Sequence, residues 1–399
     1  MIFVNTDYNR SNNIVHKLFL LLFYFQLILA LMPIWRGSFL LKFLSYDTLM
    51  QIWTLGGLFS SIGISFFIAI IQRKVYNPLI FYCIIILYYF LFLSITINGL
   101  QSGLLLLTGM PVSYIALYDT LRQYKFSTKH LRLAYTALLI WSILPIIYFL
   151  ISPPSIKILF VTGENGSILT FGGFAAHRNF YGILLGIAVI ITILINIKKI
   201  YKIIIFIPLC IGLMLSECRT AIISIFGTLI YIFLFNKNIR LKKKLFFITI
   251  MIILICIIYY IITYANILTR DVSNNEDRIE LWLGFIDIIK ENIFFGLGKE
   301  AMYYSKGFPE GAQAHNFILA TISSYGLFSF LSFILFLFCV FQYSNFYFKS
   351  FLVYLILWGI TQPYFGCSLI SVHIFIPLFF GHLLDNYKES QINQLDNYN

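Results

Sequence analysis

The chain has 399 residues, of which 60% are hydrophobic, 19% aromatic and only 11% charged, and its formal net charge is +12. Soluble domains carry roughly 25% charged residues, so this composition excludes a soluble globular protein. Apolar stretches of about 20 residues recur along the chain, the length that crosses roughly 30 Å of hydrocarbon as a helix. They are too long and continuous for strands of an outer-membrane barrel, which alternate over about 10 residues. The sequence therefore predicts an all-α polytopic membrane protein.

About twelve membrane-spanning helices are expected in chain order. They cover residues 17–35, 50–71, 79–98, 100–119, 131–151, 179–197, 201–216, 219–236, 245–266, 316–341, 350–366 and 368–385. Together they form a single integral membrane domain over residues 1–399, with one large loop at 267–315. The first span is not followed by a small-residue cleavage site, so we expect it to be an uncleaved anchor.

The basic residues predict the orientation of these spans. Four short connections, at 72–74, 122–132, 198–202 and 240–244, are basic, and each follows an even-numbered span. Cytoplasmic loops carry an excess of Lys and Arg, so these connections and both termini should face the cytoplasm. The positive net charge then reflects topology, and no nucleic-acid partner is indicated.

Residues 201–236 are apolar except for a polar interruption at 216–220. One straight helix over this range would be about 54 Å long, too long for a bilayer without extreme tilt. Both flanks are basic, and a single crossing would place one of them outside. Two helices that meet in a tight turn remove both difficulties. This arrangement puts Glu217 and Arg219 at the outer membrane surface.

The two sizeable outer loops have recognisable local patterns. Residues 152–178 alternate apolar and polar residues around Gly163 to Gly166, which predicts a small β-hairpin before the sixth span. In the 267–315 loop, Ser273 to Glu276 has the spacing of a capping box, which predicts a short amphipathic helix. The apolar face of that helix is expected to consist of Ile279, Trp282, Leu283, Ile286 and Ile289, and to lie on the membrane surface or on the other helices.

The outer face also carries the candidate functional residues. The chain has no Walker loop, dinucleotide fingerprint or paired-aspartate motif, and its cysteines lack the spacing of a metal site, so no cofactor and no metal is expected. Instead, Arg178, Arg219, Arg278 and His315 all fall on the face that the positive-inside rule would deplete of arginine. Arg278 lies in the first turn of the loop helix, where the positive end of the dipole favours an anion.

Three short motifs carry a family resemblance. They are Ser216-x-Cys218-Arg219-Thr220-Ala221, then Arg278-x-x-x-Trp282 running into Asn292-Ile-Phe-Phe-Gly296-x-Gly298, and His315-Asn316-x-x-Leu319 with Gly326-Leu327. In this order, with a large loop between spans nine and ten, they resemble the bacterial O-antigen ligase and O-antigen polymerase family over roughly residues 210–330. The resemblance implies a GT-C-like glycosyltransferase of the bacterial inner membrane that acts on the outer face.

The resemblance also implies a donor, an acceptor and roles for residues. Such enzymes take a glycan from an undecaprenyl-diphosphate carrier and pass it to a sugar hydroxyl, without a nucleotide or a metal. Arg219 and Arg278 would bind the diphosphate, because guanidinium holds phosphate oxygens in a bidentate fork, and His315 would be the general base. The candidate substrate-binding residues are Arg178, Asn179, Trp282, Glu217 and Asn316. Besides the lipid bilayer, a chain-length regulator and a flippase are the expected partners.

Several alternatives stay open at this point. The 267–315 loop is short for a ligase, which favours a polymerase of O-antigen or capsular repeat units; a ligase that transfers the glycan to lipid A core is the alternative. A flippase or transporter of lipid-linked sugars is a second alternative, although spans such as 245–266 lack charged residues, and a non-catalytic scaffold is a third. Arg178 and Arg278 can be structural or solvated charges.

Other candidate residues also have structural explanations. Arg219 can snorkel to the interface and pair with Glu217. Asn316 can serve only as the N-cap of the tenth span. Trp282 can belong to the core or to the interfacial aromatic belt instead of stacking on a sugar.

Overall fold

The computed structural model describes nine stretches that carry the argument, with further residues between 17 and 56 and between 239 and 249. These stretches are residues 23–32, 78–98, 126–151, 160–162, 169–175, 178–236, 274–298, 314–360 and 371–396. The expected spans at 50–71, 100–119 and 245–266 lie largely or wholly outside the described residues, so the count of twelve spans stays a prediction.

The described elements are helices, together with one small β-hairpin. The helices are α3 (Pro78–Asn98), α5 (Thr128–Ile151), α6 (Arg178–Leu194), α7 (Lys199–Ser216), α8 (Arg219–Phe235), α10 (Asn274–Glu291), α11 (Phe317–Tyr343), α12 (Phe346–Ile360) and α14 (Ser371–Asp396). Four of them are long and apolar enough to cross a membrane, namely Pro78–Ile97, α5, α7 and α11, and α6, α8 and α12 are shorter apolar helices. The prediction of a helical membrane protein is confirmed at this level.

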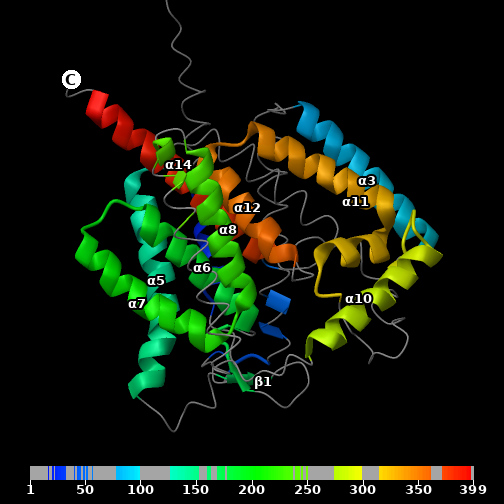
Figure 1. The fold of residues 1–399 in the computed structure, drawn as a ribbon, viewed down its shortest axis with the longest axis horizontal. Coiled ribbons are helices and arrows are strands. Elements are labelled where there is room, and N and C mark those ends of the chain that lie inside the picture. Colours follow the sequence, from blue (N-terminus) through cyan, green and yellow to red (C-terminus); the bar gives the residue numbers. More distant parts are fainter. Residues whose placement is uncertain are drawn as a thin grey trace, which may run out of the picture.

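Helix α6 lies at the centre of the left-hand part of the molecule, among α5, α7 and α8 (Figure 1). Every residue of α6 from Asn179 to Thr192 is buried. A helix that is apolar all round must be buried on all sides, and neighbouring helices provide that cover here. The N-terminus of α6 is Arg178, so one predicted site residue begins the most enclosed helix of the described part.

The predicted hairpin is present and packs onto the start of α6. Strands β1 (Phe160–Thr162) and β2 (Leu169–Phe171) pair antiparallel, with Phe160 opposite Phe171. Phe171 is fully buried and meets the ring of Tyr181 edge-on at 5.6 Å between centroids. The hairpin thereby fixes the path of the chain into Arg178.

The interruption at 216–220 is a turn between two helices, as the sequence predicts. Helix α7 ends at Ser216, Glu217 adopts a left-handed conformation with φ 49° and ψ 26°, and α8 begins at Arg219. The amide of Glu217 donates to the carbonyl of Met214, at 3.1 Å, which satisfies one of the free carbonyls at the helix end.

Helix α11 differs from the expected straight span because it is broken at Gly326, where φ is 83° and ψ 171°. A continuous helix would bond the Leu327 amide to the Ser323 carbonyl. Here the Leu327 amide instead donates to the Ile293 carbonyl, and the Ser323 carbonyl accepts from the Leu297 amide, both at 2.8 Å. We call residues 293–297 the inserted segment. Its hydrogen bonds pair the backbone amide and carbonyl groups that the break in α11 leaves without their helical partners. A protein in a bilayer must pair such groups internally, because no water is available in the hydrocarbon region.

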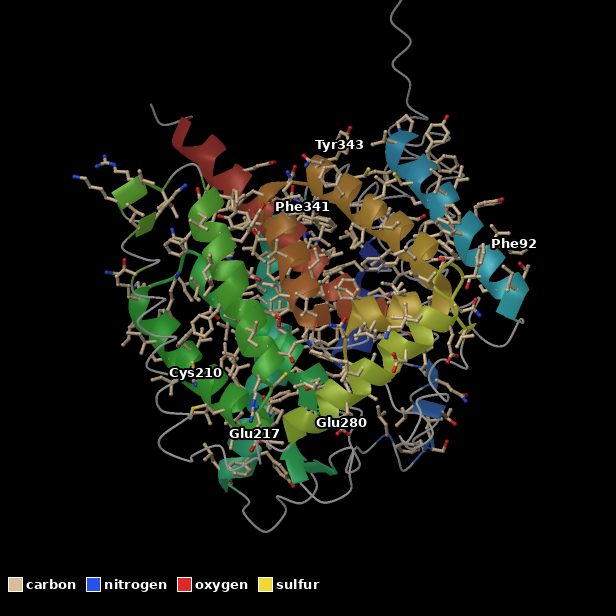
Figure 2. The ribbon with its side chains drawn as sticks, turned by 45° about the vertical axis from the view of Figure 1, so that its right-hand side comes forward. Phe92, Cys210, Glu217, Glu280, Phe341 and Tyr343 are labelled. Atoms are coloured by element: carbon tan, nitrogen blue, oxygen red, sulfur yellow. The ribbon has the colours of Figure 1, made fainter. Side chains whose placement is uncertain are left out.

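The helices give the molecule two chemically different ends. Tyr343, at the end of α11, lies at the upper end in Figure 2, whereas Glu217 and Glu280 lie at the lower end. Lys202 at the start of α7 donates to the Ile193 carbonyl at 2.7 Å, and the pKa of Lys388 on α14 is lowered by burial and by the neighbouring Lys202. The basic connection between α6 and α7 and the end of α14 thus lie close together, at the end of α7 opposite Glu217.

Candidate functional site

The first group of candidate residues lies where α6 begins and α7 turns into α8. The Arg178 guanidinium (Nη1) is 4.0 Å from the Glu217 carboxylate (Oε2), and their side chains are 12% and 40% exposed. Next to Arg178, the amide oxygen of Asn179 accepts a hydrogen bond from the Cys218 thiol at 3.6 Å. The structure therefore brings together Arg178, Asn179 and Glu217, which the sequence places in two separate segments.

Close packing of α6 against the turn makes this approach possible. A Cβ atom on Gly182 would lie 2.5 Å from the sulfur of Cys218, which is closer than real side chains come. Burial raises the pKa of the Cys218 thiol to about 11, and the nearby positive charge of Arg178 lowers it by a smaller amount. Cys218 is consequently a neutral hydrogen-bond donor at physiological pH rather than a nucleophile.

Arg219 is exposed at the first position of α8. The alternative that it pairs with Glu217 is wrong for the described structure, in which the carboxylate of Glu217 pairs with Arg178. An exposed guanidinium at the same turn as Glu217 is available to a ligand at this end of the molecule. Its role in binding a diphosphate stays a prediction.

The second group lies on α10 and at the start of α11. The indole N–H of Trp282 donates to the carbonyl of Ala314 at 2.7 Å. Asn316 caps α11, because its side-chain oxygen accepts from the amides of Ile318, at 2.9 Å, and Leu319, at 3.2 Å. The predicted N-cap is confirmed. His315 lies between these two anchored residues and is half-buried.

Helix α10 forms where the capping-box pattern predicts a helix, and of the two places expected for its predicted apolar face, the membrane surface and the other helices, the structure excludes the second for most of that face. The face that packs on the protein consists of Leu281, Phe285 and Ile288, which are at most 7% exposed. Ile279, Leu283 and Ile286 are exposed, at 55%, 56% and 37%. Both sets recur at helical spacing, so periodicity alone cannot decide between them; the docking of Trp282 onto Ala314 turns the 281–285–288 face toward the protein.

Arg278 lies within α10, one helical turn before Trp282, so the two positions share a face of the helix. Its side chain lies outside the described residues. Glu280, two positions further, is at the same end of the molecule as Glu217 in Figure 2. The hydrogen bonds and the ion pair described above each join residues of the same group. Glu217, in the first group, and Glu280, on the helix of the second group, lie at the same end of the molecule (Figure 2).

Backbone conformation singles out one residue of each group. Among the non-glycine residues of the described part, the two with positive φ are Glu217, at 49°, and His315, at 47°. A non-glycine residue in this region costs about 1–3 kcal/mol and persists only where the surroundings impose it, and such residues cluster at functional sites. Both lie at the boundary of a helix, and both were selected from the sequence for their side-chain chemistry.

Comparison with known proteins adds an independent result. Residues 203–334 match the model of the O-antigen ligase family. This segment, about a third of the chain, is similar to the O-antigen ligase family. The matched segment includes Glu217, Arg219, Arg278, Trp282, His315 and Asn316, and it ends just after the break in α11. Members of the O-antigen ligase family are membrane glycosyltransferases that use a lipid-linked sugar donor. No curated protein matches the chain.

Two features of the candidate site do not follow from the sequence. The first is the hydrogen bond from Cys218 to Asn179. The presence of a cysteine in the first motif does not by itself predict this hydrogen bond. The second is the meeting of the inserted segment with the break in α11. The sequence contains a signal for it, because Gly296 and Gly326 both belong to the motifs named above, but the fold decides that the two segments meet.

Proposed function

We propose that this protein is a polymerase of O-antigen or capsular polysaccharide repeat units in the bacterial inner membrane. It transfers a glycan from an undecaprenyl-diphosphate carrier to the hydroxyl of an acceptor sugar on the outer face. One observation carries the proposal: the family-matched segment contains Arg219, Arg278 and His315, and the two strained non-glycine residues of the described part, Glu217 and His315, belong to the same segment.

In the proposed reaction, the acceptor hydroxyl oxygen attacks the anomeric carbon of the donor glycan. The bond from that carbon to the diphosphate oxygen breaks, and its electron pair leaves with the diphosphate. The hydroxyl proton passes to the imidazole of His315 as the new glycosidic bond forms. The lipid diphosphate is already a good leaving group, so the step requires no nucleotide.

The arginines have a distinct part in this proposal. Arg219 and Arg278 hold the diphosphate, where a guanidinium supplies fixed positive charge and a planar pair of donors for the charge that develops on the leaving group. Arg178 is already paired with Glu217, so its contribution is to order the turn that presents Arg219. Asn179 supports the same turn through Cys218.

Two other functions remain as alternatives to the polymerase. A ligase would use the same donor chemistry and differ only in its acceptor, lipid A core. A flippase would move the lipid-linked glycan without breaking the anomeric bond, and it would not need a base at His315.

The test is an in-vitro transfer assay with an undecaprenyl-diphosphate-linked oligosaccharide as both donor and acceptor, from about pH 5.5 to 8. Purified wild-type protein should release undecaprenyl diphosphate and lengthen the glycan, with a rate that depends on pH because a base must accept the hydroxyl proton. His315→Ala should lower the rate by about 10²- to 10⁴-fold. The control is His130→Ala, at the start of α5, which should keep wild-type activity. No transfer by folded wild-type protein, or an active His315→Ala enzyme with unchanged pH dependence, contradicts the proposed mechanism.

A further inference from the structure

The turn that carries His315, residues 314–316, is anchored on both sides of a strained residue. His315 has φ 47°, which L-residues with a Cβ rarely adopt. On its N-terminal side, the carbonyl of buried Ala314 accepts the indole N–H of Trp282 at 2.7 Å. On its C-terminal side, Asn316 is extended, with φ −154°, and caps α11 through two amides.

The strain at His315 is therefore imposed by its neighbours. Strained residues persist where the surrounding structure over-determines them. Phe317, the residue after the cap Asn316, is buried, as is Ala314, so neither side of the turn is free to relax into solvent. Because Trp282 belongs to α10 and Asn316 to α11, the conformation of this turn depends on how those two helices are placed relative to each other.

The placement of α10 on α11 is fixed at a second point. The inserted segment, which follows α10 directly, bonds to the break in α11 through Leu297 and Ile293, as described above. The ring of Phe294 stacks on Phe328 of α11, with 5.2 Å between centroids. Helix α10 is thus held at its middle, through Trp282, and again just after its C-terminal end, through the inserted segment, so Trp282 meets Ala314 in a defined orientation.

From this geometry we infer that Trp282 is a positioning residue for His315 rather than a platform for a sugar ring. Its indole N–H holds the Ala314 peptide and thereby aims the imidazole that accepts the proton. This inference rests on the proposed function, in which His315 is the base. It differs from the substrate-stacking role expected for Trp282, because positioning requires the indole N–H whereas stacking requires only the ring face, so the two roles predict different effects of removing the N–H.

The test is Trp282→Phe, which removes the N–H donor and keeps an aromatic ring. If Trp282 positions His315, this variant should lower kcat for glycan transfer by about 10- to 100-fold at unchanged KM for the lipid-linked donor, since a small misplacement of a catalytic group is costly. If it stacks on a sugar, Phe should largely preserve kcat. A variant with kcat within about two-fold of wild type overturns the inference.

The matched control is Trp141→Phe on α5. Trp141 is buried, and its indole N–H has no hydrogen-bond partner in the part of the chain that the structure describes. The same chemical change there removes no such bond and should leave kcat unchanged. Equal losses of kcat in both variants would indicate a general packing effect and refute the positioning role.

The double variant Trp282→Phe/His315→Ala connects the two residues. If Trp282 acts through His315, the double variant should be no slower than His315→Ala alone, because residues that act as a unit are not additive. Independent, multiplicative losses would refute the coupling.

A readout that does not depend on catalysis separates this inference from the proposed function. Diethyl pyrocarbonate modification of His315, followed by peptide mass spectrometry, should be faster in Trp282→Phe than in wild type, and unchanged in Trp141→Phe. If His315→Ala proves fully active, the base is wrong, and the modification rate alone decides whether Trp282 holds the turn. An unchanged rate would then overturn the inference as well.

Discussion

Gly296 and Gly326 each pack on the backbone of the segment that carries the other, although one follows α10 and the other interrupts α11. Both have positive φ, at 67° and 83°. A Cβ atom on Gly326 would lie 2.1 Å from the carbonyl oxygen of Phe294, and one on Gly296 would lie 2.6 Å from the backbone of Ser324 and Tyr325. The contact can form only if both residues are glycine, because a backbone atom cannot move aside as a side chain can.

Gly326→Ala should therefore destabilise the protein strongly, by more than about 3 kcal/mol, from the left-handed backbone and the clash together. The control is Gly227→Ala on α8, where a Cβ would meet only the end of the Leu357 side chain. That leucine can change rotamer, so a smaller loss is expected. Thermal unfolding in detergent, followed by intrinsic fluorescence, measures both. Similar melting temperatures for the two variants would contradict the inserted-segment contact.

Glu217→Gly separates the two roles of Glu217. Glycine is the preferred residue where a helix ends in a left-handed conformation, so the free energy of unfolding should stay the same or rise by up to about 1 kcal/mol. Loss of the 4.0 Å pair with Arg178 offsets little of this, because Glu217 is substantially exposed. If the carboxylate takes part in substrate binding, transfer should fall in a protein of normal stability. A fully active Glu217→Gly variant would mean that Glu217 only ends the helix.

Replacement of the arginines tests the diphosphate site. Arg219→Ala and Arg278→Ala should abolish most transfer, and the lysine variants should remain well below wild type, because an ammonium lacks the planar fork that binds two phosphate oxygens. The control is Lys290→Gln on α10, whose side chain is 70% exposed and pairs with Asp287 within the same helix. Transfer rate and donor KM should be measured at equal membrane levels. Normal polymer output from both alanine variants would assign the arginines to the solvated surface.

The proposed orientation can be tested by labelling from outside the cell. In a variant without the six natural cysteines, Glu280→Cys should react with a membrane-impermeant maleimide in intact cells, with any outer membrane permeabilised. Lys242→Cys, on the basic connection after α8, should react only after lysis. The reverse pattern would place Glu217 and Glu280 in the cytoplasm and exclude a lipid-linked donor on the outer leaflet.

The buried Cys218 thiol should respond little to alkylating reagents. Burial raises its pKa from 9.0 to about 11, so the thiolate is scarce at neutral pH. The protonated thiol favours the folded state below pH 9, and this contribution is lost as pH rises from about 9 to 11, because the unfolded chain deprotonates first. Iodoacetamide alkylation of Cys218, measured by mass spectrometry, should be slow in the folded protein and fast after denaturation. Rapid alkylation of folded protein at pH 8 would contradict the burial of this turn.

The sequence determined the elements whose signals are local. Length and apolarity predict the spans, the polar interruption predicts the turn at Glu217, and the Asn316 cap follows from the residue type and its position before an apolar run. The hairpin before α6 follows from alternation around a glycine-rich turn. These patterns depend on neighbours within a few residues, so they can be recognised without the fold.

The tertiary structure decided which distant residues meet. Trp282 and Ala314 are 32 residues apart, and nothing in either segment specifies that an indole N–H would reach that carbonyl. The pairing of Glu217 with Arg178 instead of neighbouring Arg219 results from the packing of α6 on the α7–α8 turn. Likewise, α10 has two apolar faces of equal periodicity, and only its attachment to α11 determines that Leu281, Phe285 and Ile288 are buried. The chemistry of each side chain can be read along the chain. Long-range hydrogen bonds and the choice of buried face depend on how the helices pack, and the order of the helices in the chain does not determine that packing.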